Sequence, residues 1–161
     1  MRNEIVEISD IDVVGIATHT SNMLEATPQG RIVSLHEAFI TKHISDVIAS
    51  KKDNRMLAIY TDYEDEESGE YLYAIGHHVL DSTDIPEGCE HFHIPKGKYL
   101  LYPTERGFIN EVLPLAWQNI WRLTQEGGLG GIRTYKTDFE FHNYDDPLSP
   151  DVQIDIYIGV E

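Results

Sequence analysis

The order of predicted secondary-structure elements occurs twice along the chain, and this repeat limits the fold more than any other feature. A strand, a helix and two strands are expected within residues 1–85, and the same order returns within residues 86–161. Each copy has an apolar face to bury, so two copies favour a shared sheet with helices packed on it. The sequence therefore predicts a single domain over residues 1–161 with an α+β fold. We expect duplicated βαββ units that form one largely antiparallel eight-stranded sheet with two main helices, related by a pseudo-twofold axis.

The first copy contains β-branched runs, a stretch with helical spacing and two further strands. Asp10 and Asp12 break the β-branched runs, which predicts a bend or bulge. Lys51 and Lys52 follow the helical stretch, where positive charge suits the negative end of a helix dipole. The predicted elements are a bent strand at 5–19, a helix from 30 to about 50, strands at 56–60 and 71–76, and an acidic hairpin loop at 63–70.

The second copy repeats this order with clearer boundaries. Pro114 lies inside the helical pattern, so the helix either starts there or is kinked. The glycine-rich segment 127–131 predicts the end of this helix and a linker, because a phosphate-binding loop would precede a helix. The predicted elements are a strand at 91–102 interrupted at 95–97, a helix at 108–123, a strand at 133–142, a turn at 145–150 and a strand at 152–160.

The charge of the chain excludes some classes of partner. The formal net charge is -16, from 28 acidic and 12 basic residues. Duplex binding needs clustered Lys and Arg, so we expect no direct nucleic-acid partner and no anionic membrane partner. A negative field attracts organic cations, although the same acids could simply confer solubility.

The single cysteine and the N-terminus indicate the compartment. Cys89 cannot form an intramolecular disulfide, which is consistent with a reducing environment. No apolar run of signal-peptide or membrane-spanning length is present in the sequence. We therefore expect a cytoplasmic protein.

Strand alternation brings one carboxylate to attention. The last strand has an apolar row, which we expect to face the helices: Val152, Ile154, Ile156, Ile158 and Val160. In the preceding strand Phe139 and Phe141 share one row, and Asp138, Glu140 and His142 share the other. A carboxylate in mid-strand is either solvated on an open face or held in a pocket. The solvated face is the more common case.

Aromatic side chains with a polar tip are abundant, which is typical of ligand pockets. Trp117 and Trp121 are four residues apart and stack on one helix face, where a core role is the alternative. Tyrosine also simply favours strands. The tyrosines on predicted strands are Tyr60, Tyr71, Tyr73, Tyr99, Tyr135 and Tyr157. His91 and His93 have no partner at a recognisable ligand spacing, so we expect no metal and no cofactor.

An ordered set of short motifs resembles a known family. In chain order these are Val13–Ile16, Tyr60–Tyr63, Tyr71–Gly76, Ile94–Tyr99, Trp117–Trp121, Phe139–Glu140 and Val152–Ile158. Together they resemble GyrI-like domains, also called bacterial transcription-activator effector-binding domains. The resemblance implies the doubled βαββ (SHS2-like) fold and an aromatic cleft near the pseudo-twofold axis. It also implies that Glu140 meets lipophilic cations there, because a partly desolvated carboxylate among rings attracts a delocalised cation.

The predicted ligand site follows from this resemblance: Glu140, Tyr60, Tyr73, Tyr99, Trp117, Tyr157 and His142. Two positions depart from the family pattern. His142 replaces an aromatic residue and could repel a cation when protonated, and Gly159 replaces a proline. Many relatives carry a helix-turn-helix DNA reader, which we do not expect here because the motifs begin near Val13.

Three functions are compatible with these features. The first is reversible binding of a small cationic or amphipathic aromatic compound, without catalysis and without a DNA-binding segment. The second is hydrolysis of strained cyclopropane-containing genotoxins by a Tyr/Glu pair, as in some GyrI-like proteins. The third is a protein-interaction module for a regulator or a topoisomerase, in which the acidic loop at 64–70 meets a basic partner, although a solvated hairpin is the simpler interpretation.

Overall fold

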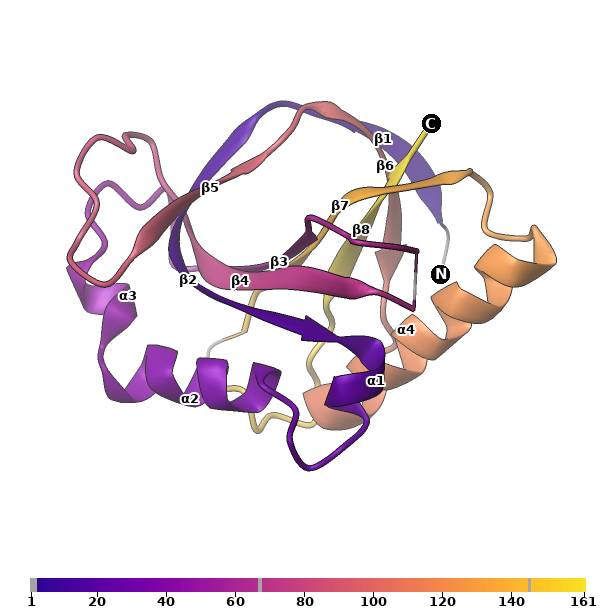
Figure 1. The fold of residues 1–161 in the computed structure, drawn as a ribbon, viewed down its shortest axis with the longest axis horizontal. Helices are drawn as coiled ribbons and strands as arrows, with labels where there is room; N and C mark the ends of the chain where they lie inside the picture. Colours follow the sequence, from indigo (N-terminus) through magenta and orange to yellow (C-terminus); the bar gives the residue numbers. More distant parts are fainter. Residues whose placement is uncertain (1–2, 67, 145) are drawn as a thin grey trace.

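One curved sheet of eight strands carries helices on one face (Figure 1). The computed structural model describes residues 3–66, 68–144 and 146–161, so Glu67 of the predicted acidic loop and Asp145 of the predicted turn lie outside the described residues. The elements are β1 (Glu4–Ile8), β2 (Ile11–Ser21), α1 (Asn22–Glu25), α2 (Ile32–Thr41), α3 (Ile44–Val47), β3 (Met56–Thr61), β4 (Glu70–His78), β5 (Glu90–Ile94), β6 (Gly97–Pro103), α4 (Ile109–Glu126), β7 (Arg133–His142) and β8 (Asp155–Val160).

The strand order confirms the predicted duplication. The sheet runs β1-β6-β8-β7-β3-β4-β2-β5, and its pairings are antiparallel. If β1, β2, β3 and β4 are exchanged with their counterparts β5, β6, β7 and β8, the same strand order results, read from the opposite edge of the sheet. The pseudo-twofold axis therefore passes between the two central strands, β3 and β7. Ala58 of β3 pairs with Glu140 of β7, which places Glu140 beside the axis.

The bends predicted at the start of each copy lie in a two-stranded ribbon. β1 and β2 pair with β6 and β5 as one antiparallel ribbon, which arches over the sheet face opposite the helices (Figure 1). The Asp10 carboxylate accepts the backbone N–H of Lys96 at 3.0 Å and so ties the two bends together. Under the arch lies an apolar core that includes Val13, Tyr99 and Phe139. Both faces of the sheet are therefore covered.

The helix face holds the second part of the core. Ala116 and Ile120 of α4 pack against the apolar row of the C-terminal segment, Ile154, Ile156, Ile158 and Val160. This confirms that the row faces the helices. Phe39 of α2 packs against β4 in a neighbouring cluster, and Tyr60 contacts both clusters.

Two predicted boundaries are wrong. The helix expected to reach residue 50 breaks at His43, whose φ of 53° ends α2, and the chain turns so that Ile44 and Ile48 become buried. Lys51 does donate to a carbonyl of the short helix α3, that of Ser45, at 2.9 Å. The last strand starts at Asp155 and not at residue 152, because the Ile154 N–H is bound by the Thr104 hydroxyl at 2.9 Å.

The structure also shows where the helices α4 and α1 begin and how α4 ends. α4 starts at Ile109, so Pro114 lies inside it, and Gly127 ends it with a φ of 75° in the left-handed region. The short helix α1 was not predicted, and it begins where the Ser21 hydroxyl accepts the Leu24 N–H at 3.0 Å. Across the described ranges, no helix has the length and apolar character needed to span a membrane.

Gly15 and Gly76 face each other across β2 and β4, and the strands approach closely there. A Cβ on Gly15 would lie 1.9 Å from the Ile75 carbonyl oxygen, so Gly15→Ala must push the two strands apart. We expect this variant to lower the free energy of unfolding by about 1–3 kcal/mol, measured by urea denaturation. Gly128→Ala is the control, because its Cβ would lie 3.4 Å from Cδ2 of Leu123, an ordinary contact. Equal stability of both variants would contradict this account.

Candidate functional site

A cavity of about 550 Å³ opens between the sheet and helices α1, α2 and α4. Its walls carry five aromatic residues, Tyr60, Tyr63, Tyr71, Trp117 and Trp121, and we call it the aromatic cavity. The Tyr60 ring lies at its centre, with ring centroids of Trp117 at 5.0 Å and Tyr71 at 5.7 Å. The remaining lining residues are Asn22, Glu25, Ala26, Ile32, Ile109, Asn110, Leu113, Pro114, Gln118 and Arg133.

Glu140 lies directly behind two of these rings. Its side chain is fully buried, and its Oε2 accepts the Tyr60 hydroxyl at 2.7 Å and the Trp117 indole N–H at 2.6 Å. The other oxygen, Oε1, lies 2.7 Å from Nε2 of His142. Burial raises the pKa of the carboxyl, but the hydrogen bond and charge of His142 and the donors from Trp117 and Tyr60 outweigh it and hold the pKa below its usual value.

The interpretation of Glu140 as a solvated residue is wrong for a tertiary reason. The row that contains Asp138, Glu140 and His142 faces the helices, while Phe139 and Phe141 face the ribbon. Because the helices cover one face and the ribbon covers the other, residues 137–140 of β7 are buried on both faces. A carboxylate in either row would have needed partners.

A second buried carboxylate lies two residues earlier on the same row. Asp138 accepts Nη2 of Arg133 at 2.6 Å, the Tyr63 hydroxyl at 2.6 Å and the Gly159 N–H at 2.8 Å. The irregular register between Arg133 and Asp138, with Tyr135 at a φ of 53°, brings the guanidinium back over its own strand. It stacks 4.3 Å from the centroid of the Tyr135 ring. The Arg133–Asp138 pair is thus a fixed ion pair in the cavity wall.

Two histidines complete the network behind the cavity. His36 of α2 lies 2.7 Å from the Tyr73 hydroxyl, and Nδ1 of His142 lies 3.2 Å from the Tyr144 hydroxyl. Burial, and then the charge of His142, lowers the pKa of His36 to about 4. His36 is therefore neutral at physiological pH.

The fold brings together five of the seven residues predicted from the sequence: Glu140, Tyr60, Tyr73, Trp117 and His142. Tyr99 and Tyr157 lie on the opposite face, so they do not share a cavity with Glu140. The Tyr99 hydroxyl donates to the Pro95 carbonyl at 2.6 Å, and Tyr157 stacks on Phe139 at 4.7 Å. Both tyrosines belong to the core under the ribbon.

Sequence reasoning missed several residues at this site. Tyr71 shares a row with Tyr73, and Trp121 follows Trp117 by one helical turn, so periodicity could have added both. Tyr63 falls in the loop predicted at 63–70, and the Arg133–Asp138 pair depends on the irregular register of β7. No local signal marks these three residues.

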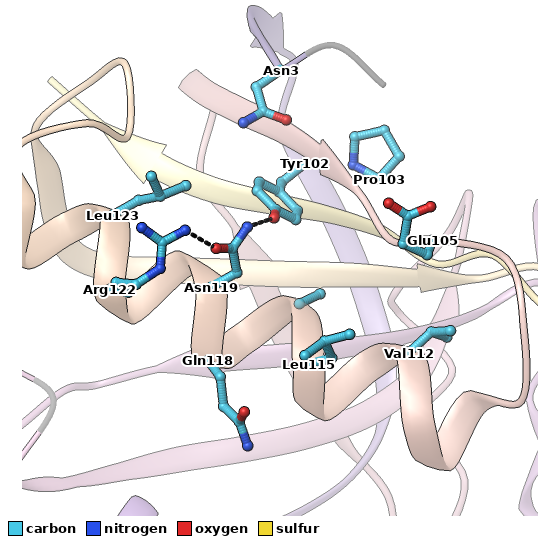
Figure 2. Close-up of a pocket in the computed structure, with 11 residues that line it drawn as sticks. Asn3, Tyr102, Pro103, Glu105, Val112, Leu115, Gln118, Asn119, Arg122 and Leu123 are labelled. Atoms are coloured by element: carbon cyan, nitrogen blue, oxygen red, sulfur yellow. Dashed lines mark hydrogen bonds between the residues drawn. The ribbon is translucent and has the colours of Figure 1, made fainter.

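A second cavity, of about 690 Å³, lies on the other flank of α4 (Figure 2). A chain of hydrogen bonds runs across it from Arg122 through Asn119 to the Tyr102 hydroxyl. Its lining contains a single aromatic ring, that of Tyr102, and none of the predicted site residues. We therefore take the aromatic cavity as the candidate site, although it is the smaller one.

The structure also shows the surroundings of His91 and His93, the histidine pair for which no metal is expected. His91 and His93 hydrogen-bond to Asp12 and Asp10 at 2.8 and 2.9 Å on the exposed side of the ribbon. Among the residues that the structure describes, no group of three or more His, Cys, Asp or Glu is arranged to hold a metal ion.

Comparison with known families agrees with this geometry. The family described as Cass2, integron-associated effector binding protein, matches residues 4–160 of the chain. The chain belongs to the Cass2 family. The match covers both copies of the duplicated unit and the aromatic cavity between them. The predicted membership of the GyrI-like effector-binding group is confirmed, and binding of an effector is the role that this Cass2 description states.

Individual relatives align with most or all of this chain. YobU of Bacillus subtilis is 26% identical over 148 residues, covering 91% of this chain and 90% of YobU. The transcriptional regulator BrlR of Pseudomonas aeruginosa is 30% identical over 166 residues, covering 99% of this chain but only 56% of BrlR. The structure of SAV2435 bound to tetraphenylphosphonium aligns with a TM-score of 0.79 at 16% identity, over 100% of this chain and 94% of SAV2435. This last likeness shows a shared fold.

The pKa of His36 predicts how stability changes with pH. Its value of about 4 lies below the ordinary 6.5, so the unfolded chain takes up this proton first. The free energy of unfolding therefore falls as the pH is lowered from 6.5 towards 4. His36→Gln removes this titration and retains an amide near the Tyr73 hydroxyl. We expect the fall in stability over this range to be about 1–2 kcal/mol smaller in the variant, after allowing for partial solvent screening.

Urea denaturation at several pH values checks this expectation. His19→Gln is the control, since His19 is exposed on β2. An identical pH dependence in His36→Gln and in the unmodified protein would refute the role given to His36.

Proposed function

We propose that the aromatic cavity reversibly binds a lipophilic aromatic cation and catalyses no reaction. One observation carries the proposal: a fully buried carboxylate accepts hydrogen bonds from two rings that line the cavity, Tyr60 and Trp117. The ligand would contact the rings, and the negative charge would lie immediately behind them.

This arrangement suits a delocalised cation for an electrostatic reason. A ring that donates a hydrogen bond to an anion becomes more electron-rich, which strengthens the attraction of its face for a cation. The carboxylate is shielded from water, so its field is screened less than at the surface. Since Glu140 is already desolvated in the empty protein, binding does not have to remove its hydration shell.

The dimensions and the relatives support this class of ligand. A volume of about 550 Å³ lies within the usual range for small-molecule sites. SAV2435, which shares the fold, was solved with tetraphenylphosphonium, a lipophilic cation. The net charge of -16 would also draw cations towards the protein.

The hydrolase hypothesis has one observation in its favour, because Tyr60 and Glu140 do form a Tyr/Glu pair at 2.7 Å. A general base, however, must reach the water that it activates. Glu140 is fully buried and its two oxygens already face three donors. The geometry therefore favours binding over hydrolysis.

Glu140→Gln tests the role of the charge with little change of shape. The amide oxygen can accept from Tyr60 and Trp117, and the amide nitrogen can donate to His142, so the network can persist. We expect the affinity for tetraphenylphosphonium, measured by isothermal titration calorimetry, to fall about tenfold or more, because the rings lose the anion behind them.

Tyr157→Phe is the matched control, because this aromatic residue lies on the opposite face of the sheet. It should bind tetraphenylphosphonium as tightly as the unmodified protein does. Unchanged affinity in Glu140→Gln would show that the carboxylate is not part of the site. Absence of binding to the unmodified protein would show that the ligand class is wrong.

A further inference from the structure

The two carboxylates of the site differ in the kind of partner that balances their charge. Asp138 is paired with Arg133, and an arginine keeps its charge at every pH at which the protein is folded. Glu140 is paired with His142, and a histidine ordinarily changes its charge between pH 5 and 8. The guanidinium beside Asp138 therefore has a fixed charge, whereas the imidazole beside Glu140 can exist with or without one.

His142 is held so that both of its protonation states are satisfied. In the neutral ring, Nε2–H donates to Glu140 and Nδ1 accepts from the Tyr144 hydroxyl. In the charged ring, both nitrogens donate, because a tyrosine hydroxyl can also accept. Burial raises the pKa of Tyr144 to about 12, so this hydroxyl keeps its proton throughout. The same two partners can therefore hydrogen-bond the ring in either form.

The other ionisable groups around the cavity come from α1, α2 and the sheet. His36 on α2 has a pKa of about 4 and stays neutral. Glu25 on α1 accepts the N–H groups of Arg31 and Ile32 at the start of α2. Burial raises the pKa of each tyrosine on the sheet side, so all remain neutral: Tyr60, Tyr63, Tyr71 and Tyr73. α4 presents Trp117, Gln118 and Trp121, which do not titrate.

We propose that His142 determines which charge class of ligand the aromatic cavity accepts. With His142 neutral, Glu140 is an uncompensated anion and the cavity prefers an aromatic monocation. With His142 protonated, the pair is neutral and this preference weakens, so neutral aromatic molecules of similar shape compete better. The inference rests on the proposed binding function and adds a specificity-determining residue to it.

Linkage makes the effect reciprocal. If protonation of His142 weakens binding of a cation, a bound cation must weaken protonation of His142 by the same factor. Binding of the cation then releases a proton, whereas binding of a neutral molecule does not. This second consequence concerns His142 itself, and a residue with a purely structural role would not produce it.

The test compares two probes of similar shape, tetraphenylphosphonium and the neutral triphenylphosphine oxide. Their affinities for the full chain are measured by calorimetry at about pH 8.5 and about pH 5.5, on either side of the pH range in which histidines ordinarily titrate. We expect the ratio of their affinities to shift against the cation by about tenfold on going to the lower pH. His142→Gln keeps a donor for Glu140 but cannot take up a proton. Its ratio should stay near the value of the unmodified protein at high pH.

His36→Gln is the matched control, because it removes the neighbouring buried histidine and leaves His142 in place. It should show the same shift as the unmodified protein. A second readout is the proton resonance of the His142 ring, whose titration midpoint should move to lower pH when tetraphenylphosphonium is bound.

The outcomes separate this inference from the proposed function. If the cation binds and Glu140→Gln weakens it, but the affinity ratio does not change with pH, His142 has no selecting role. The same conclusion follows if His142→Gln keeps the shift, or if His36→Gln abolishes it. If the unmodified protein does not bind the cation, the proposed function itself fails, and if Glu140→Gln binds it normally, the role given to the carboxylate fails.

Discussion

A carboxylate buried in the middle of a sheet needs donors, and the site is organised around this need. Glu140 obtains them from three separate elements: Tyr60 of β3, Trp117 of α4 and His142 of its own strand. These bonds connect α4 to the strands at the pseudo-twofold axis, so they stabilise the packing as well as the negative charge. Loss of one partner would leave a buried charge short of donors, and each element is therefore held in place by the others.

The duplication supplies a symmetric frame, but the chemistry inside it is asymmetric. The second copy contributes Glu140, His142 and Trp117, whereas the first contributes the tyrosines and His36. α2 and α4 leave space between them over the axis, and the aromatic cavity lies in that space. A single ligand site thus arises between two similar halves, since only one half carries the carboxylate beside the axis.

The ribbon on the other face explains why residue types alone do not predict which side chains of β7 are buried. In a sheet with one open face, a strand with alternating Phe and acidic residues would turn its acids to water. Here β1, β2, β5 and β6 cover that face and Phe139 packs beneath them, so Asp138 and Glu140 turn towards the helices. The same cover removes Tyr99 and Tyr157 from the site, although their residue type and their strand positions resemble those of Tyr60 and Tyr73.

The sequence by itself determined the repeat, the alternation of β7 and β8, and the grouping of Glu140 with His142 on one row, because these properties depend on periodicity along the chain. Family-specific motifs added the expectation that Glu140 meets a ligand. Only the tertiary structure decided which face each row of β7 occupies, that Glu140 is fully buried, and that Tyr63 and Arg133, both bound to Asp138, line the cavity. The physical reason is that burial on both faces, and the contacts between strands far apart in the chain, result from the closure of the ribbon over the sheet, which no local pattern encodes.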